Sequence, residues 1–185
     1  MKPRDLPNLI SALRIVLVVP VVALLEERQY GAALAVFTLA GLSDALDGFL
    51  ARRYGWFSRL GGWLDPIADK AMMVSVFVML GFRDLIPLWL VVAVIGRDLL
   101  ILAGSVAYYL WIEKVDAAPS WISKLNTLAQ ILLIMTVLFD RGVARLPGLL
   151  LDGLIGVVVV TTVLSGAGYM LTWGARALRV RRSRS

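Results

Sequence analysis

The sequence of 185 residues contains neither cysteine nor histidine. Without cysteine there can be no disulfide bond and no thiolate metal site, and without histidine the commonest nitrogen ligand of zinc is missing. Any metal ion that the chain binds must therefore be held by oxygen atoms.

Charged residues are also few, at 17% of the chain, whereas 59% of the residues are hydrophobic. One soluble core of this length could not bury so much apolar surface, so we expect lipid to be the main solvent. The long apolar runs lack the alternation of barrel strands, and helices satisfy their own backbone polar groups. This composition predicts an all-α polytopic membrane protein. No linker or internal repeat divides it, so we expect one domain over residues 1–185.

Six apolar segments are each long enough to cross a bilayer as a helix, which takes about 20 residues. They cover residues 8–25, 31–53, 63–82, 87–111, 121–139 and 148–174. The first could be read as a secretory signal, but Arg14 lies inside it and no small-residue cleavage pattern follows. We therefore expect a retained helix and six transmembrane spans. The lack of a cleavable targeting segment favours a bacterial inner membrane.

Lysine and arginine are distributed unevenly between the two sides of this predicted bundle. With the N-terminus in the cytoplasm, thirteen of them fall in cytoplasmic segments and four on the other side. Positive residues favour the cytoplasmic side, which predicts that both termini lie inside the cell. The basic tail 176–185 contributes strongly to the net charge of +6. We expect this tail to anchor to anionic lipid head groups and not to nucleic acid.

Four aspartates stand out, because an ionisable group inside a membrane costs about 3 kcal/mol or more unless it faces water or a partner. Asp44 and Asp47 lie in the second predicted span, and Asp65 and Asp69 lie in the third. Steps of three and four residues place each pair on one helical face. Two antiparallel helices joined by a short loop can bring these faces together. The spacing therefore predicts four carboxylates around one site, near the cytoplasmic surface.

Carboxylates at this density would repel one another in a low dielectric unless cations compensate. Hard oxygen ligands select Mg²⁺, Mn²⁺ or Ca²⁺. Gly48 and Ala51 share the aspartate face of the second span and leave room for a bulky ligand, while Arg52 offers a planar cationic fork for phosphate oxygens. These neighbours indicate a pyrophosphate or a nucleotide as the ligand.

Simpler interpretations account for the parts of this pattern but not for the whole. A single aspartate near a helix end is usually a cap, and an Asp-Gly pair is usually a turn. An EF-hand is excluded because its ligands alternate along a loop. A cation or proton transporter would also carry carboxylates within its spans, but here the acidic residues cluster near one face and no ladder of polar groups crosses to the other.

The segment from Asp44 to Asp69, DALDGFLARRYGWFSRLGGWLDPIAD, resembles the signature of the CDP-alcohol phosphotransferases at every fixed position. The resemblance implies that family's fold of six transmembrane helices, with the signature across the second and third, and a homodimer. It also implies two divalent cations, Mg²⁺ or Mn²⁺, held by Asp44, Asp47, Asp65 and Asp69. Asp69 would act in addition as the general base. Gly48, Arg52 and Gly61 would help to seat the CDP moiety, beside the open face at Ala51.

The reaction implied by this resemblance is the transfer of a phosphatidyl group from CDP-diacylglycerol to a hydroxyl acceptor, with release of CMP. The signature does not name the acceptor. The opening Pro7-Asn8-Leu9-Ile10-Ser11-Ala12-Leu13-Arg14 resembles both the phosphatidylglycerophosphate synthases and the eukaryotic-type cardiolipin synthases. The segments Ile95-Gly96-Arg97-Asp98 and Ser123-Lys124-Leu125-Asn126-Thr127 are more similar to the cardiolipin synthase versions.

A neutral residue at Asn126 has a physical meaning for the choice of acceptor. The glycerophosphate enzymes more often carry a second lysine there, which suits the dianionic phosphate of glycerol 3-phosphate. Phosphatidylglycerol presents a monoanionic diester and a free glycerol hydroxyl, so Asn126 favours this lipid as acceptor and cardiolipin as product. Glycerol 3-phosphate stays the alternative. Arg97 and Lys124 are the main candidates for binding the acceptor phosphate, against the alternative of an Arg97–Asp98 ion pair and an interfacial lysine. Arg14 is a further candidate, against the alternative of a snorkelling cation.

Overall fold

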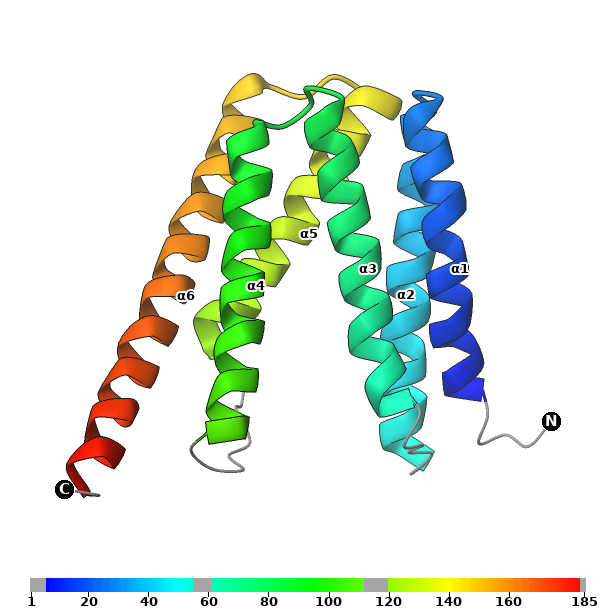
Figure 1. The fold of residues 1–185 in the computed structure, drawn as a ribbon. Coiled ribbons are helices and arrows are strands. Elements are labelled where there is room, and N and C mark those ends of the chain that lie inside the picture. Colours follow the sequence, from blue (N-terminus) through cyan, green and yellow to red (C-terminus); the bar gives the residue numbers. More distant parts are fainter. Residues whose placement is uncertain (1–5, 55–60, 112–119, 184–185) are drawn as a thin grey trace. The chain divides into compact units, whose positions relative to one another are not determined.

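The computed structural model describes residues 6–54, 61–111 and 120–183 (Figure 1). These residues form six α-helices and contain no strand, so the all-α prediction is confirmed. The helices are α1 (Leu6–Glu26), α2 (Tyr30–Tyr54), α3 (Gly61–Phe82), α4 (Leu88–Trp111), α5 (Trp121–Gly142) and α6 (Gly148–Ser183). Each of the six predicted spans falls on one of them.

The largest difference from the predicted boundaries is at the end of α6. The apolar segment ends near residue 174, yet the helix continues to Ser183. The residues that follow Gly174 are mainly alanine, leucine and arginine, which are strong helix formers. Helical structure therefore extends through most of the basic tail, although hydropathy falls there.

The helices group into two compact units, which are described separately. The first contains α1, α2 and α3 with the end of α5 from Ile134. The second contains α4, the start of α5 up to Leu133, and α6.

In the first unit, α1 packs against both α2 and α3. Side chains buried in this unit come from all four of its helical segments; they include Val21, Leu25, Phe37, Val76, Phe77, Leu80, Ile134 and Leu138. Figure 1 shows α1 and α3 running in the same direction and α2 in the opposite one. The side chain of Arg83, just after α3, donates to the carbonyl of Glu26 at the end of α1 at 2.5 Å, which fixes these two helices in parallel register.

Both α1 and α3 end in a left-handed residue that is not glycine. Arg28 has φ of 59° and Asp84 has φ of 55°. In each case the next backbone N–H bonds back to a carbonyl five residues earlier, from Gln29 to Leu24 and from Leu85 to Leu80. This is the Schellman arrangement, which satisfies the last carbonyls of a helix and lets the chain reverse within a few residues.

The end of α5 lies against the start of α2. A Cβ atom added at Gly142 would come within 2.2 Å of the backbone nitrogen of Gly31, so only glycine fits between the two backbones. The following loop is held by Asp140, whose side chain is 4% exposed. Its carboxylate accepts a hydrogen bond from the backbone N–H of Leu146 at 2.8 Å and pairs with Arg141 and Arg145 at 3.2 Å.

In the second unit, α4 packs against α6. Buried apolar side chains here include Leu90, Val94, Leu133 and Val158. Ser120 caps α5, because its Oγ accepts the backbone N–H of Ser123 at 3.2 Å. The backbone N–H of Ser120 in turn donates to the hydroxyl of Tyr169 on α6 at 3.3 Å.

Large apolar side chains are exposed on all six helices; examples are Val19, Leu39, Phe82, Trp89, Leu128 and Leu149. A soluble monomer rarely exposes so much apolar surface, and lipid contact accounts for it. Within the described residues, two helices are long and apolar enough to cross a membrane, Trp121–Gly142 and Gly148–Met170. These features are those of a membrane protein; the count of six spans stays a prediction.

Candidate active site

Three charged residues from three helices meet in the first unit. Nη2 of Arg14 on α1 lies 2.5 Å from Oδ1 of Asp44 on α2. Its Nη1 donates to Oδ1 of Asp69 on α3. One guanidinium therefore joins the first and the last of the four predicted metal-binding aspartates.

The helix register explains this meeting. Arg14 and Asp69 each lie in the third turn of their helices, which run in parallel, and Asp44 lies about three turns before the end of the antiparallel α2. The spacing of apolar residues fixes the faces that pack, and the three polar residues then come to the same level. One aspartate from each of the predicted second and third spans thus contacts the same guanidinium of α1, which packs against both helices. The direct approach of their four aspartates stays a prediction.

The three side chains differ in burial. Arg14 is 3% exposed, whereas the side chains of Asp44 and Asp69 are 38% and 48% exposed. The buried guanidinium does not extend outward as a snorkelling cation would. The role of Arg14 in binding the acceptor stays a prediction. In this structure its partners are two carboxylates, Asp44 and Asp69, that could bind metal.

The other signature residues are placed less completely. The side chains of Asp47, Ala51, Arg52 and Asp65, and the surroundings of Gly61, are outside what the structure describes. Gly48 lies half-buried on α2, one helical turn beyond Asp44. Among the side chains that the structure does describe, no three acidic residues form a metal-binding group.

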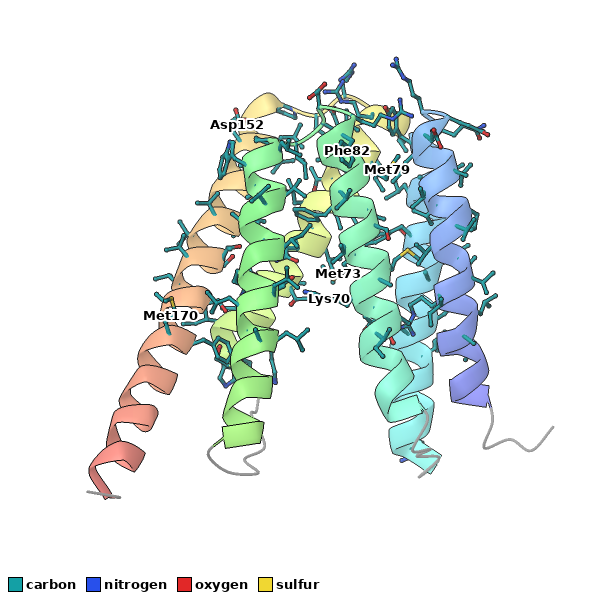
Figure 2. All side chains as sticks on the ribbon, in the orientation of Figure 1. Lys70, Met73, Met79, Phe82, Asp152 and Met170 are labelled. Carbon is teal, nitrogen blue, oxygen red and sulfur yellow. The ribbon has the colours of Figure 1, made fainter. Side chains whose placement is uncertain are left out.

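The described part of the site suits a hard cation. Two carboxylates converge on one guanidinium, so a single positive charge can interact with both at once. Their ligand atoms are oxygen, the type that Mg²⁺ and Mn²⁺ prefer, and both carboxylates are accessible enough for an ion to enter. Lys70, labelled in Figure 2, follows Asp69 on α3 and is exposed.

A second polar cluster lies in the second unit and is centred on Arg97 of α4. Its Nη1 donates to Oδ1 of Asp98 at 2.8 Å, as in the ion-pair alternative. Its Nη2 donates to the hydroxyl of Ser123 on α5 at 2.6 Å and to that of Ser165 on α6. The Arg97 side chain is 9% exposed, and its Nε is buried without a hydrogen-bond partner. Arg97 thus ties three helices together and keeps one donor unsatisfied.

Asn126 lies one turn beyond Ser123 on α5 and is fully buried. Its Oδ1 accepts hydrogen bonds from the hydroxyls of Thr161 and Thr162 on α6, each at 2.9 Å. Its Nδ2 is buried and has no partner. Lys124 has a different environment: it is exposed, and its Nζ lies 5.2 Å from the centre of the Trp121 ring, a cation–π contact.

Sequence reasoning did not single out four hydroxyl residues that support these groups, Ser123, Thr161, Thr162 and Ser165. A signal was present. Within an apolar run, Ser165 follows Thr162 by three residues and Thr161 by four; Ser123, Asn126 and Gln130 are likewise spaced by three and four residues. Polar residues that repeat along one face of a membrane helix commonly bond to a neighbouring helix.

Known proteins similar to this chain include enzymes named as cardiolipin synthases and as a phosphatidyltransferase. Rat cardiolipin synthase (CMP-forming) is 36% identical over 148 residues, which cover 71% of this chain and 49% of the rat protein. A chloroplastic CDP-diacylglycerol–glycerol-3-phosphate 3-phosphatidyltransferase from rice is 32% identical over 96% of this chain and 59% of its own length. A putative cardiolipin synthase of Mycobacterium tuberculosis is 33% identical over 73% of this chain and 65% of its own.

The matched part of this chain thus spans about half the length of the rat protein. The family model for CDP-alcohol phosphatidyltransferases matches residues 4–174, which include both polar clusters. The chain belongs to the CDP-alcohol phosphatidyltransferase family.

Proposed function

We propose that this protein transfers a phosphatidyl group from CDP-diacylglycerol to phosphatidylglycerol, giving cardiolipin and CMP. The observation that carries the proposal is the convergence of Asp44 and Asp69, the outer aspartates of the signature, on one cationic position. Family membership supports the reaction class, and the relatives named as cardiolipin synthases support the acceptor. A cation or proton transporter gains no support from either.

The proposed chemistry is a displacement at phosphorus. A hydroxyl oxygen of the acceptor forms a bond to the phosphatidyl phosphorus, and the bond from that phosphorus to the oxygen of CMP breaks. Asp69 takes the proton of the attacking hydroxyl, since its carboxylate is accessible and lies at the site. Bound divalent ions would supply charge neutralisation at the pyrophosphate. Asp44, Asp47, Asp65 and Asp69 would hold them.

The remaining signature residues complete the donor side of the proposal. Gly48 and Ala51 leave space beside the aspartates, and Arg52 and Gly61 help to seat the CDP group. On the acceptor side we assign Arg97 and Asn126, because their side chains are at most 9% exposed, lie in the second unit and carry buried donors without partners. Lys124 would attract the acceptor phosphate from an exposed position.

The membrane arrangement is part of the same proposal. We infer six transmembrane spans, a homodimer, and a bacterial inner membrane with both termini and the active site on the cytoplasmic side. The water-soluble CMP would then leave into the cytoplasm while the diacyl chains stay in lipid.

Glycerol 3-phosphate is the second candidate acceptor. The rice relative whose name specifies this acceptor matches 96% of the chain, a larger share than the rat cardiolipin synthase does. The buried and uncharged Asn126 argues the other way, because a dianionic phosphate would gain more from a cation at this position.

One assay separates the two acceptors. Purified protein in liposomes, with Mg²⁺ or Mn²⁺ and CDP-diacylglycerol, is given either phosphatidylglycerol or glycerol 3-phosphate, and the lipid product is identified by mass spectrometry. We expect cardiolipin with the first acceptor and no new lipid with the second. Formation of phosphatidylglycerophosphate would overturn the acceptor assignment and keep the reaction class.

A further inference from the structure

A row of polar side chains joins α5 to α6 inside the second unit. Ser123 and Asn126 are three residues apart on α5, and Thr161, Thr162 and Ser165 lie within four residues on α6. Residues three or four apart, as Ser123 is from Asn126 and Ser165 is from both threonines, share one helical face. Asn126, Thr162 and Ser165 are all buried, at most 5% exposed.

In the Asn126 amide, the oxygen accepts two hydrogen bonds and the nitrogen donates none. Its Oδ1 has two lone pairs, and each takes a hydrogen bond from a threonine hydroxyl. Its Nδ2 carries two hydrogens and is buried without a partner. Buried polar groups nearly always find a hydrogen bond, so an orphan amide at 0% exposure indicates a missing acceptor.

The two threonines do not hold the amide equally. The hydroxyl of Thr161 also lies 2.8 Å from the carbonyl oxygen of Val157 and 3.2 Å from that of Val158, so its single proton has three candidate acceptors. The hydroxyl of Thr162 is buried and donates to Asn126 at 2.9 Å. We therefore expect Thr162 to fix the orientation of the Asn126 amide more firmly than Thr161 does.

The chemistry of the missing partner follows from a second orphan donor. Nε of Arg97 is also buried and unpartnered, and the Ser123 that binds Arg97 lies one turn before Asn126. The two buried N–H donors therefore come from α4 and α5, and one of them is cationic. They suit an anionic ligand that is rich in oxygen. The head group of an acidic phosphodiester lipid with a polyol has this chemistry.

We propose that Thr161 and Thr162 are positioning residues for the acceptor: their hydroxyls hold Asn126 Oδ1 and thereby direct its Nδ2 donors toward the oxygens of the acceptor head group. The inference rests on the proposed function, since it takes the acceptor to be such a lipid. It assigns α6, which lies outside the aspartate signature, to recognition of the acceptor.

Thr162→Val and Thr162→Ser form a matched pair for the test. Valine keeps the shape and loses the hydroxyl, whereas serine keeps the hydroxyl. CMP release is measured in liposomes with phosphatidylglycerol and CDP-diacylglycerol varied in turn. We expect valine to raise the KM for phosphatidylglycerol about tenfold, the size of one hydrogen bond, and to leave the KM for CDP-diacylglycerol within about twofold. Serine should restore the wild-type KM, and Thr161→Val should give a smaller rise.

Asn126→Asp provides the second variant should valine prevent folding, which size-exclusion chromatography would reveal. Aspartate still accepts both threonine hydrogen bonds but replaces the donor with an acceptor oxygen, so the KM for phosphatidylglycerol should again rise selectively. An unchanged KM for phosphatidylglycerol, or an equal rise for both substrates, would show that the threonines only support the fold or that water satisfies the amide. A wild-type protein that releases no CMP with phosphatidylglycerol would instead overturn the proposed function.

Discussion

Arg14 shows how one residue can join side chains from different helices at one site. Its guanidinium is buried and contacts both Asp44 and Asp69, which we propose as metal ligands. Two carboxylates brought to one position repel each other unless a positive charge lies nearby. The buried arginine supplies that charge here, so the guanidinium and a divalent ion would compensate the same carboxylates.

This shared role predicts that Arg14→Gln destabilises the metal-free protein more than the metal-loaded one. Removing one partner of a buried ion pair leaves uncompensated charge; because the carboxylates are partly exposed, we expect a loss of about 2 kcal/mol. Thermal unfolding followed by fluorescence of the six tryptophans, in EDTA and in Mg²⁺, measures the difference.

Arg53→Gln is the control, since Arg53 is exposed on α2. The control should unfold like the wild type in both conditions, and Mg²⁺ should raise the unfolding temperature most for Arg14→Gln. An equal loss with and without Mg²⁺ would mean that Arg14 serves the fold and does not substitute for a cation.

The contacts of Arg14 could not be predicted from the sequence. The spacing of the aspartates on their helices is local and gives their faces, but Arg14 and Asp69 are 55 residues apart. Only the packing of α1 on α2 and α3 decides that the guanidinium reaches them. For the same reason the threonine partners of Asn126, 35 and 36 residues away, became visible only in the structure.

At the scale of helices and their ends, hydropathy was a good guide. It gave all six helices to within a few residues at most boundaries because apolar runs and helices coincide in a membrane protein. The predicted end of α6 was too early, because arginines lower the hydropathy without weakening the helix. It could not reveal the close approach of α2 and α5, which depends on tertiary packing.

The close approach of α2 and α5 predicts that one added methyl group at Gly142 destabilises the fold. Gly142→Ala would place Cβ at 2.2 Å from the backbone of Gly31, and backbone cannot move aside as a flexible side chain can. We expect a loss of about 1 to 3 kcal/mol, seen as a lower midpoint of thermal unfolding.

Gly153→Ala on α6 is the matched control. A Cβ at this position meets no atom within 4 Å, and alanine favours the helix more than glycine does. Its unfolding midpoint should be unchanged or slightly higher. Equal effects of the two substitutions would show that α2 and α5 do not approach as closely as the structure indicates.

At the scale of the whole molecule, each unit carries a polar cluster of its own. The first holds Arg14 with Asp44 and Asp69; the second holds Arg97 and Asn126 with their hydroxyl partners. The composition gave no hint of this grouping, because α5 contributes its start to one unit and its end to the other. Membership of the family was predictable, since the signature is local and the family match includes it.

The central claim is that the aspartates of the first unit carry out metal-dependent transfer from CDP-diacylglycerol. CMP release by Asp69→Asn at saturating Mg²⁺ tests it most directly, because asparagine keeps the size of the side chain and cannot take the proton of the attacking hydroxyl. We expect a rate at least about a hundredfold below that of the wild type, the usual contribution of a general base. A variant that released CMP at the wild-type rate would contradict it.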